Sequence, residues 1–447
     1  MFLGNVELRP HRIALFAGNY NYLMDGPAKA LNRLVGFLGR QGVEVRVYSP
    51  TTSSPAFKPT GKLVSVPSIA LPGRGEYRLG WGLPRAIRED LEAFNPSLLH
   101  ITAPDLTGHA ALKLAQEWGI PAIASYHTRF DTYLRYYGLG VFEPLLTRAM
   151  VRFYNRCDQV LAPSASMAEE LQAQGITSDV RIWSRGVDHS LFNPKQRDHD
   201  WRLSHDIRDS EVLITFVGRL VWEKGLQFLV DTLENLRARC VPFHCLIVGD
   251  GPARAKLEKK LPGAIFTGHL SGKKLARAYA SSDIFLNPSL SETFGNTTLE
   301  SMASGVPAVC ANATGSRSLV EQGVTGYLAK PGDLEDFTYW LAKLAKSPDL
   351  RKSLSSNSVK SSQAYHWSKI LNGLLDNYYD ALGLPASTRS CRALIQDLTD
   401  PDGMRASVSI SKQKRDFTPK QTWHGGLATP QDFAGQNAHG IALGGQS

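Results

Sequence analysis

The sequence lacks the features of a membrane-spanning or secreted protein. Among its 447 residues, no apolar run reaches the roughly 20 residues that a membrane-spanning helix needs. The N-terminus also lacks the charged start, apolar core and small-residue cleavage site of a secretory signal. We therefore expect a protein that stays in the cytoplasm.

The cysteines offer neither a metal site nor a disulfide framework. There are five, they form no C-x-x-C pair, and their odd number leaves one over in any disulfide scheme. They are Cys157, Cys240, Cys245, Cys310 and Cys391. We expect buried thiols, no metal site and no cofactor.

Acidic residues are fewer than basic ones. Fifty Lys and Arg against 41 Asp and Glu give a net charge of +9, which suits nucleotide diphosphates, acidic lipid surfaces or nucleic acid. The sequence has no long Lys/Arg block, zinc-finger spacing or aromatic RNA-binding signature. These absences argue against nucleic acid as a partner.

Strand-like and helical runs alternate along most of the chain. A buried strand at 12–17, a helix at about 27–41 and a second strand at 44–48 form a β-α-β unit. The alternation continues to residue 183, breaks at the polar segment 195–202 and restarts at residue 212. This pattern predicts the α/β class, with parallel, doubly wound sheets in two domains of similar size.

The most informative stretch is IFLNPSLSETFGNTTLESMASGVP, a buried strand, a polar loop and a helix predicted to begin near Asn296. Glu292 lies in the loop and Glu300 eight residues later on the helix, so both can face one pocket. Phe294 and Gly295 precede the helix, whose unpaired amides and positive dipole end favour a phosphate. The spacing alone fits equally well a loop carboxylate in water and a charge on the helix surface.

A second polar loop, GRLVWEKG, follows the buried strand at 212–217. Arg219 and Lys224 would stand at the carboxyl end of the sheet, where open α/β sheets bind ligands. Two cations there would neutralise a leaving diphosphate in place of a metal ion. Gly218, which starts the loop, is a further candidate for donor binding. The alternative is a solvated Arg–Glu–Lys cluster on the surface.

The two glutamates and the residues between them, Glu292-Thr-Phe-Gly-Asn-Thr-Thr-Leu-Glu300, resemble the signature of glycosyltransferase family 4. The resemblance implies that Glu292 holds hydroxyls of the donor sugar and that Glu300 holds the nucleotide ribose. It also implies that the Phe294 and Gly295 amides meet sugar and phosphate. The family places its diphosphate-binding Arg and Lys in the second polar loop.

The resemblance further implies the GT-B architecture, two Rossmann-like β/α domains facing across a cleft. We expect an N-terminal acceptor domain at 1–190 and a C-terminal nucleotide-sugar donor domain at 191–366. A helix at 367–384 would return to the first domain. The remaining tail, 385–447, is rich in Gly, Gln, Thr, Ser and Pro with few large apolar groups, which predicts disorder.

Two glycine-containing turns carry weaker signals. The run GDGP follows a strand, but Arg254 replaces the third glycine of a dinucleotide fingerprint, which argues against NAD binding. Gly268 lies in a turn, TGHL, that resembles the family's turn whose backbone brackets the nucleotide base. The alternative interpretation of this turn is an ordinary strand-to-helix connection. Gly26 stands where the family has a pair of glycines; it permits positive φ and close approach, whereas Pro27 removes an amide donor.

The first domain contributes three further candidates. His127 ends a predicted strand; a lone histidine there is usually a packed residue, but in related enzymes it contacts the transferred sugar, without acting as a general base. Asp131 would contact the acceptor or cap a helix. Tyr136, in a Tyr-Tyr-Gly run, is the other candidate for acceptor binding.

The segment RIWSRGVD, which starts at Arg181, resembles a narrower branch of the family. This branch includes sulfoquinovosyl-diacylglycerol synthases and GDP-mannose-dependent α-mannosyltransferases that act on glycolipids. It implies a lipid acceptor and peripheral contact with the inner face of the membrane. Arg148, Arg152 and Arg156, beside Leu145 and Met150, would form one cationic stripe for anionic lipid, although a charged stripe also fits a solvated helix face. The segment 74–88, with four arginines and Trp81, offers a second.

The sequence therefore predicts a metal-independent, retaining glycosyltransferase. It would move a hexose-type sugar from a UDP- or GDP-sugar to an acceptor, with a glycerolipid or glycolipid at the membrane surface as the candidate. A non-catalytic nucleotide-sugar-binding protein is one rival, kept open by the altered loop at Gly26. An NAD-dependent oxidoreductase is the other, and the incomplete glycine motif argues against it.

Overall fold

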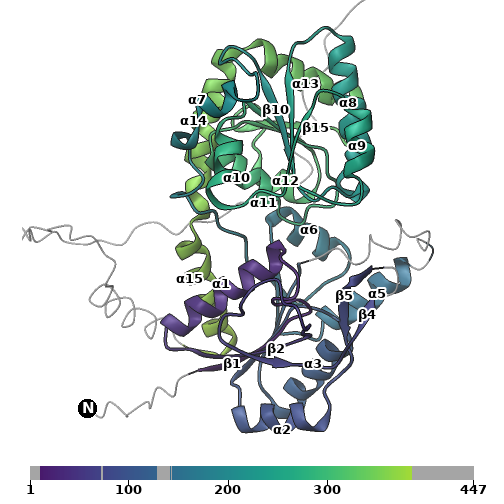
Figure 1. The fold of residues 1–447 in the computed structure, drawn as a ribbon. Helices are drawn as coiled ribbons and strands as arrows, with labels where there is room; N and C mark the ends of the chain where they lie inside the picture. The colour runs from purple at the N-terminus through teal and green to yellow at the C-terminus, as the bar shows by residue number, and fades with distance from the viewer. Residues whose placement is uncertain (1–10, 72–73, 128–140, 142, 385–447) are drawn as a thin grey trace, which may run out of the picture. The chain divides into compact units, whose positions relative to one another are not determined.

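Two parallel sheets organise the computed structural model, which describes residues 11–71, 74–127, 141 and 143–384 (Figure 1). Both sheets lie within one compact unit, residues 1–390. The domain boundaries inside this unit stay predictions. The predicted tail, 385–447, lies outside the described residues.

The first sheet has seven parallel strands in the order β3-β2-β1-β6-β7-β8-β9. The strands are β1 (Arg12–Phe16), β2 (Glu44–Ser49), β3 (Lys62–Ser65), β6 (Leu98–Ile101), β7 (Ala122–Ser125), β8 (Gln159–Ala162) and β9 (Asp179–Ile182). Their helices are α1 (Gly26–Arg40), α2 (Arg85–Phe94), α3 (Leu106–Trp118), α5 (Glu143–Tyr154) and α6 (Ala165–Ala173). The order of the strands reverses between β1 and β6.

The second sheet has six parallel strands in the order β12-β11-β10-β13-β14-β15. The strands are β10 (Leu213–Val217), β11 (His244–Val248), β12 (Ile265–Gly268), β13 (Ile284–Asn287), β14 (Ala308–Ala311) and β15 (Gly326–Ala329). The α-helices are α7 (His199–Leu203), α8 (Leu226–Ala238), α9 (Arg254–Lys260), α10 (Gly272–Ala280), α11 (Asn296–Ala303), α12 (Thr314–Leu319), α13 (Leu334–Lys346), α14 (Pro348–Ser362) and α15 (Trp367–Ala381). Short 3₁₀ turns in the described ranges include η2 (Pro194–Gln196), η3 (Trp222–Lys224) and η4 (Gln363–Tyr365).

Each sheet is covered on both faces. In β1, Ile13 and Leu15 belong to one buried cluster, whereas Ala14 and Phe16 belong to the cluster on the opposite face. β10 divides its side chains between two clusters in the same way. Strands buried on both faces read as continuous apolar runs, which is why the sequence predicted these strands well.

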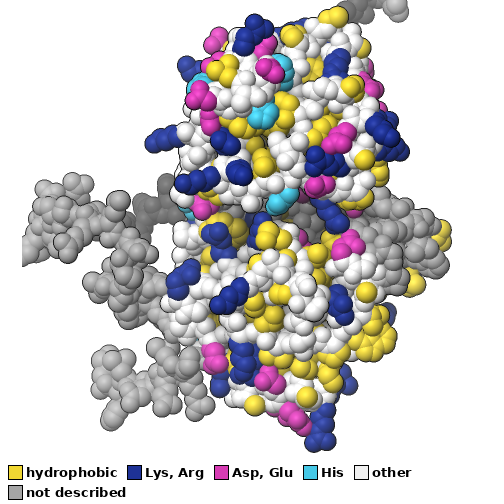
Figure 2. Space-filling model, in the orientation of Figure 1, with side chains coloured by type: hydrophobic (Ala, Val, Ile, Leu, Met, Phe, Trp, Pro, Cys, Tyr) yellow, Lys and Arg dark blue, Asp and Glu magenta, His cyan; other side chains and the backbone are white. Residues whose placement is uncertain are grey.

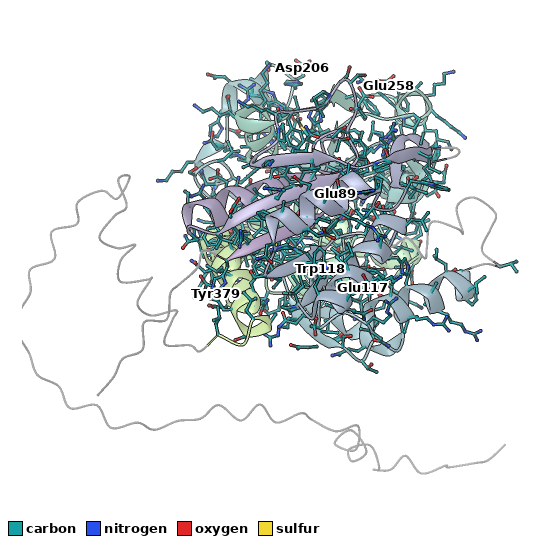
Figure 3. The ribbon with its side chains drawn as sticks, turned by 90° about the horizontal axis from the view of Figure 1, so that it is seen from below. Glu89, Glu117, Trp118, Asp206, Glu258 and Tyr379 are labelled. Atoms are coloured by element: carbon teal, nitrogen blue, oxygen red, sulfur yellow. The ribbon has the colours of Figure 1, made fainter. Side chains whose placement is uncertain are left out.

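The last described helix, α15, packs on the first sheet rather than the second. Leu371, Leu374 and Tyr378 share a buried cluster with Leu31 of α1, and the two helices lie side by side (Figure 1). Figure 3 shows α15 from below, with Tyr379 labelled. The last described helix is thereby fixed to the first.

Some features differ from the sequence-based expectations. The antiparallel hairpin of β4 (Ser68–Leu71) and β5 (Arg74–Gly80) was not predicted. Met150, expected in a surface stripe, is 6% exposed and packs in the core. Cys240 is exposed, whereas three other cysteines are buried as expected, namely Cys157, Cys245 and Cys310. Cys391 lies outside the described residues. No helix in the described ranges is both long and apolar enough to cross a bilayer.

Candidate active site

Two neighbouring strands of the second sheet place the predicted donor-binding loops next to each other. β10 and β13 pair in parallel, and the strand order reverses between them. β10 leads to η3, and β13 leads through residues 288–295 to α11, which begins at Asn296 as predicted. The carboxyl ends of strands at such a reversal are where open α/β sheets bind ligands.

The structure brings Lys224 and Glu292 into direct contact. Nζ of Lys224 donates a hydrogen bond to Oε1 of Glu292 at 2.7 Å, and the side chains are 28% and 19% exposed. The Glu292 carbonyl accepts bonds from the Gly315 amide at 2.8 Å and from the Thr314 hydroxyl at 2.7 Å. The loop is thus held by its backbone while the carboxylate stays at the site.

Glu300 lies on α11 beside a tyrosine that the sequence analysis missed. The hydroxyl of Tyr279 donates to Oε2 of Glu300 at 3.1 Å, and the tyrosine is fully buried. Burial raises the pKa of Glu300 to about 7, and the bond from Tyr279 opposes that rise. Glu300 therefore exchanges its proton close to neutral pH.

Gly295 and Phe294 shape the start of α11. Gly295 has a φ of 97°, in the left-handed region that favours glycine, and it offers no side chain to cap the helix. The first amides of α11 therefore have no capping side chain and suit an anion. The Phe294 ring is 4% exposed and meets Tyr365 edge-on, with 6.0 Å between ring centroids. Its ring anchors the loop, which leaves its backbone for the site.

Arg219 is held by the hairpin of the first half. Its Nη2 lies 3.2 Å from Oε1 of Glu76, and its Nη1 donates to the hydroxyl of Tyr77 at 3.4 Å. The Arg219 side chain is 44% exposed, and ion pairs that exposed stabilise a fold by only about 0–1 kcal/mol. A diphosphate would readily compete for this guanidinium.

The glycine turns after β10, β11 and β12 pack against one another through the backbone. The Gly218 amide donates to the Val248 carbonyl at 3.0 Å, and the Gly249 amide donates to the Gly268 carbonyl at 2.9 Å. A Cβ on Gly249 would lie 1.9 Å from the carbonyl oxygen of Gly218. Backbone packing thus explains the GDGP run without a dinucleotide.

Gly26 faces the start of α11. It is the first residue of α1, which Asp25 caps by accepting a bond from the Ala28 amide at 2.8 Å. The left-handed conformation that glycine permits is not used there. A Cβ on Gly26 would instead lie 2.7 Å from Nδ2 of Asn296, so close approach explains the glycine.

His127 touches the donor loop through its backbone. Its carbonyl accepts a bond from the Thr293 hydroxyl at 3.1 Å. Its ring nitrogens lie 2.6 Å from Nη2 of Arg185 and 2.8 Å from Oγ of Ser125. The other two candidates from the first half, Asp131 and Tyr136, lie outside the described residues.

The start of α6 also contacts the donor loop, which the sequence analysis did not predict. The Ser164 hydroxyl donates to the Thr293 carbonyl at 2.9 Å. The Ser166 amide donates to Oγ of Ser318 at 2.9 Å, and its hydroxyl donates to the Thr314 carbonyl. Serines are common at helix starts, so nothing in the sequence marks Ser164 as a contact of the donor loop or Ser166 as a contact of α12.

Comparisons with known proteins agree with this arrangement. Residues 24–191 match the family model described as Glycosyltransferase Family 4, and residues 211–347 match Glycosyl transferases group 1. The sulfoquinovosyl transferase of Arabidopsis thaliana is 31% identical over 384 residues, which cover 83% of this chain and 74% of that protein. The GDP-mannose-dependent alpha-mannosyltransferase of Mycolicibacterium smegmatis is 35% identical over 390 residues, which cover 86% and 100%.

A solved structure shares the fold. The sucrose-phosphate synthase of Thermosynechococcus elongatus superposes with a TM-score of 0.69 at 20% identity, over 83% of this chain and 99% of that one. The predicted fold class, GT-B with two Rossmann-like domains, is confirmed. With both halves matched by family models and with relatives above 30% identity covered over most of their length, the chain belongs to glycosyltransferase family 4, as its sequence signature predicted.

Proposed function

We propose that this glycosyltransferase moves a hexose-type sugar from a UDP- or GDP-sugar to a glycerolipid or glycolipid, with retention of the anomeric configuration. The observation that carries the proposal is the contact of Lys224 with Glu292 beside the uncapped start of α11. It puts a cation, a carboxylate and an uncapped helix start at one edge of the sheet, which supports these roles in donor binding.

Each donor fragment has a partner there. The diphosphate lies on the amides of Phe294 and Gly295, and Lys224 and Arg219 neutralise its charge. Glu292 accepts bonds from sugar hydroxyls, and Glu300 accepts bonds from the ribose. Fixed cations and amides need no reorganisation when charge builds up on the leaving group, which is why they lower the barrier.

Retention follows if acceptor and leaving group use the same face of the sugar. The bond from the anomeric carbon to the diphosphate oxygen breaks, and the acceptor oxygen bonds to that carbon from the same side. The acceptor proton passes to the diphosphate oxygen that has just been released. Lys224 stabilises that oxygen while it carries negative charge.

An exposed apolar surface on the first half supports a lipid acceptor. Ile69 and Leu79 are cross-strand partners in the β4–β5 hairpin, and the Trp81 amide extends the pairing by donating to the Pro67 carbonyl at 2.8 Å. Alternation along the strand then puts Leu79 and Trp81 on one face, and Trp81 is 59% exposed. Figure 2 shows hydrophobic side chains gathered over this hairpin.

Charge on α5 also suits anionic lipid. On α5, Leu145 is 67% exposed, and Arg148 and Arg152 are exposed as well. Arg156 follows the helix and bonds to Gln116. Apolar side chains flanked by arginines are typical of surfaces that enter the headgroup region of a membrane without crossing it.

The test is mass spectrometry of lipids after incubation of the full chain with membrane lipid extract and a panel of UDP- and GDP-sugars. We expect one donor to add one sugar mass to one lipid class, and Glu292→Gln to abolish the product. Release of nucleotide diphosphate without a lipid product would overturn the lipid acceptor and leave sugar transfer intact. Nucleotide-sugar binding without any turnover would overturn the catalytic assignment of these residues.

Membrane contact is tested separately by flotation with vesicles that contain anionic lipid. The double variant Leu79→Ser with Trp81→Ser should lose most of the bound fraction. Tyr339→Ser removes a similarly exposed aromatic, 52% exposed on α13, and serves as the matched control. Equal binding of both variants and the parent would reject the hairpin as the contact surface.

A further inference from the structure

Both ring nitrogens of His127 form hydrogen bonds with buried side chains. Nη2 of Arg185 lies 2.6 Å from its Nδ1, and Oγ of Ser125 lies 2.8 Å from its Nε2. The indole of Trp183 meets the imidazole edge-on, with 5.5 Å between ring centroids. The ring therefore has no nitrogen left for another partner.

The first of these contacts fixes where the imidazole carries its proton. A guanidinium can only donate hydrogen bonds, so Nδ1 of His127 must accept. A doubly protonated ring would set two donors against each other at 2.6 Å. His127 is therefore neutral with its proton on Nε2, which donates to Ser125.

Apart from His127, Arg185 contacts backbone carbonyls and an aromatic ring. It is 5% exposed, its Nη1 donates to the carbonyls of Trp183 at 2.8 Å and Ser184 at 3.2 Å, and it stacks on the Trp183 ring at 4.7 Å. Within the described ranges, no carboxylate forms an ion pair with it. Burial lowers its pKa to about 10, which still leaves it charged at neutral pH. Burying a cation costs free energy that the two carbonyl contacts offset only in part.

We infer that Arg185 is a positioning residue that locks His127 neutral, in one tautomer and one orientation, at the sugar-binding edge of the site. The lock also fixes the His127 carbonyl, which accepts from Thr293, the neighbour of Glu292 in the donor loop. The inference rests on the proposed function, because it assumes that the His127 and Glu292 region receives the sugar.

The same chain of bonds extends to α15. Oγ of Ser125 lies 2.9 Å from Nε2 of His100, whose Nδ1 lies 2.7 Å from the hydroxyl of Tyr378. In the described part of the chain, the titratable and charged groups facing His127 are thus Arg185 and His100, with Tyr378 behind them. The pKa of His127 lies well below its ordinary value because burial, and then Arg185 and His100, disfavour a positive charge on the ring.

The test measures the protonation state of His127 by NMR, so it does not depend on turnover. The full chain, labelled with ¹⁵N at its 12 histidines, is titrated from about pH 5.5 to 8, and the His127 signal is assigned by its loss in His127→Gln. We expect parental His127 to stay neutral, with its proton on Nε2, throughout. Arg185→Met should move the pKa of His127 upward, although burial still opposes the charged form, and should let the neutral ring populate both tautomers. Arg185→Lys, which keeps a buried donor, should restore the Nε2-protonated form.

Steady-state kinetics then test whether the contact between Arg185 and His127 affects turnover. Arg185→Met should lower kcat by roughly 10- to 100-fold, since small misplacements at a site cost that much, with a smaller change in donor KM. Arg185→Lys should recover part of the loss. If Arg185→Met does not fold, Ser125→Ala is the second variant, in which His127 must remain neutral because Arg185 still donates to Nδ1.

Three results would overturn the inference: a parental His127 with its proton on Nδ1, a His127 held wholly in the Nε2-protonated form in Arg185→Met, or titration of His127 in Ser125→Ala. Failure of the proposed function looks different, because the tautomer result would stand while no donor was turned over.

Discussion

Lys224 and Glu292, 68 residues apart in the sequence, neutralise each other across 2.7 Å at the end of the second sheet. In the proposed reaction these residues serve different parts of the donor, the lysine its diphosphate and the glutamate its sugar. An incoming diphosphate competes for the lysine and thereby frees the carboxylate for the sugar hydroxyls. The ion pair keeps both groups in place until that exchange.

Lys224→Ala should lower turnover by roughly 10²- to 10³-fold with the fold intact, because it removes charge stabilisation from the leaving diphosphate. Lys224→Arg, which keeps the charge, is the control. Steady-state kinetics of Lys224→Ala, Glu292→Ala and the double variant should be non-additive, since the two groups share one interaction. Unchanged transfer kinetics in Lys224→Ala would reject its role.

Arg202 offers a prediction about stability away from the site. It is fully buried, pairs with Asp283 at 3.0 Å and donates to the carbonyls of Ser281, Arg208 and Glu211. Arg202→Met should lower the free energy of unfolding by about 3–5 kcal/mol, because the carboxylate and carbonyls lose their buried donor. Urea denaturation measures the change.

The matched control is Arg208→Met, which removes an ion pair with Glu211 from a side chain that is 77% exposed. It should cost no more than about 1 kcal/mol. Equal losses in the two arginine variants would show that burial is not what makes Arg202 stabilising.

Local patterns were sufficient to predict the parts of the site that follow directly from a buried strand. The loops with Lys224 and Glu292 each come after an apolar run, and the helix carrying Glu300 begins at Asn296 as its sequence indicated. The carboxyl ends of parallel strands lie at one edge, so these residues could be grouped before any coordinates. The hairpin was missed because its strands contain no run of buried apolar residues, and the apolar partners Ile69 and Leu79 are exposed.

The supporting contacts could not be predicted because they join segments far apart in the chain. Nothing near Tyr279 signals that its hydroxyl meets Glu300, and nothing near Arg185 signals that it meets His127, 58 residues earlier. Met150 looked like a surface residue beside arginines, and only the packing of α5 shows that it faces inward. A periodic pattern gives the face of an element, but not what that face meets.

Nucleotide binding should depend on pH through Glu300. Its pKa is raised from 4.5 to about 7, and only the ionised carboxylate accepts bonds from both ribose hydroxyls. Affinity for UDP or GDP should therefore rise as pH increases through about 7. Calorimetry from pH 6 to 8 measures it, with Glu300→Gln as the control because the nucleotide phosphate also titrates; parallel profiles in the two proteins would contradict the assignment.

Tyr279→Phe tests whether the hydrogen bond from Tyr279 contributes to the pKa of Glu300. The Tyr279 hydroxyl favours the ionised form of Glu300 by donating to it, so its loss should raise the pKa of Glu300 further and move the midpoint of nucleotide binding to higher pH. A midpoint that stays in place or moves lower would rule out this bond as a determinant.

Stability should respond to Glu300 in the opposite direction. The folded state holds the Glu300 proton more tightly than the unfolded chain does, so the contribution of Glu300 is fully present below about pH 4.5. It is lost as pH rises through about 7. Comparing the pH dependence of unfolding in the parent and in Glu300→Gln isolates this contribution, and identical slopes between pH 5 and 7 would contradict the raised pKa.

Gly315 should set the position of the donor loop, because its lack of a side chain lets the loop backbone pack directly against it. A Cβ on Gly315 would lie 2.5 Å from the carbonyl carbon and oxygen of Phe294, so the loop backbone must move in Gly315→Ala. Because the Gly315 amide also donates to the Glu292 carbonyl, the shift reaches the residue proposed to hold the donor sugar. Turnover should fall roughly 10²-fold. Gly373→Ala is the matched control, since a Cβ on that helical glycine meets nothing within 4 Å and alanine favours a helix by about 1 kcal/mol; parental kinetics in Gly315→Ala would mean that the loop tolerates displacement.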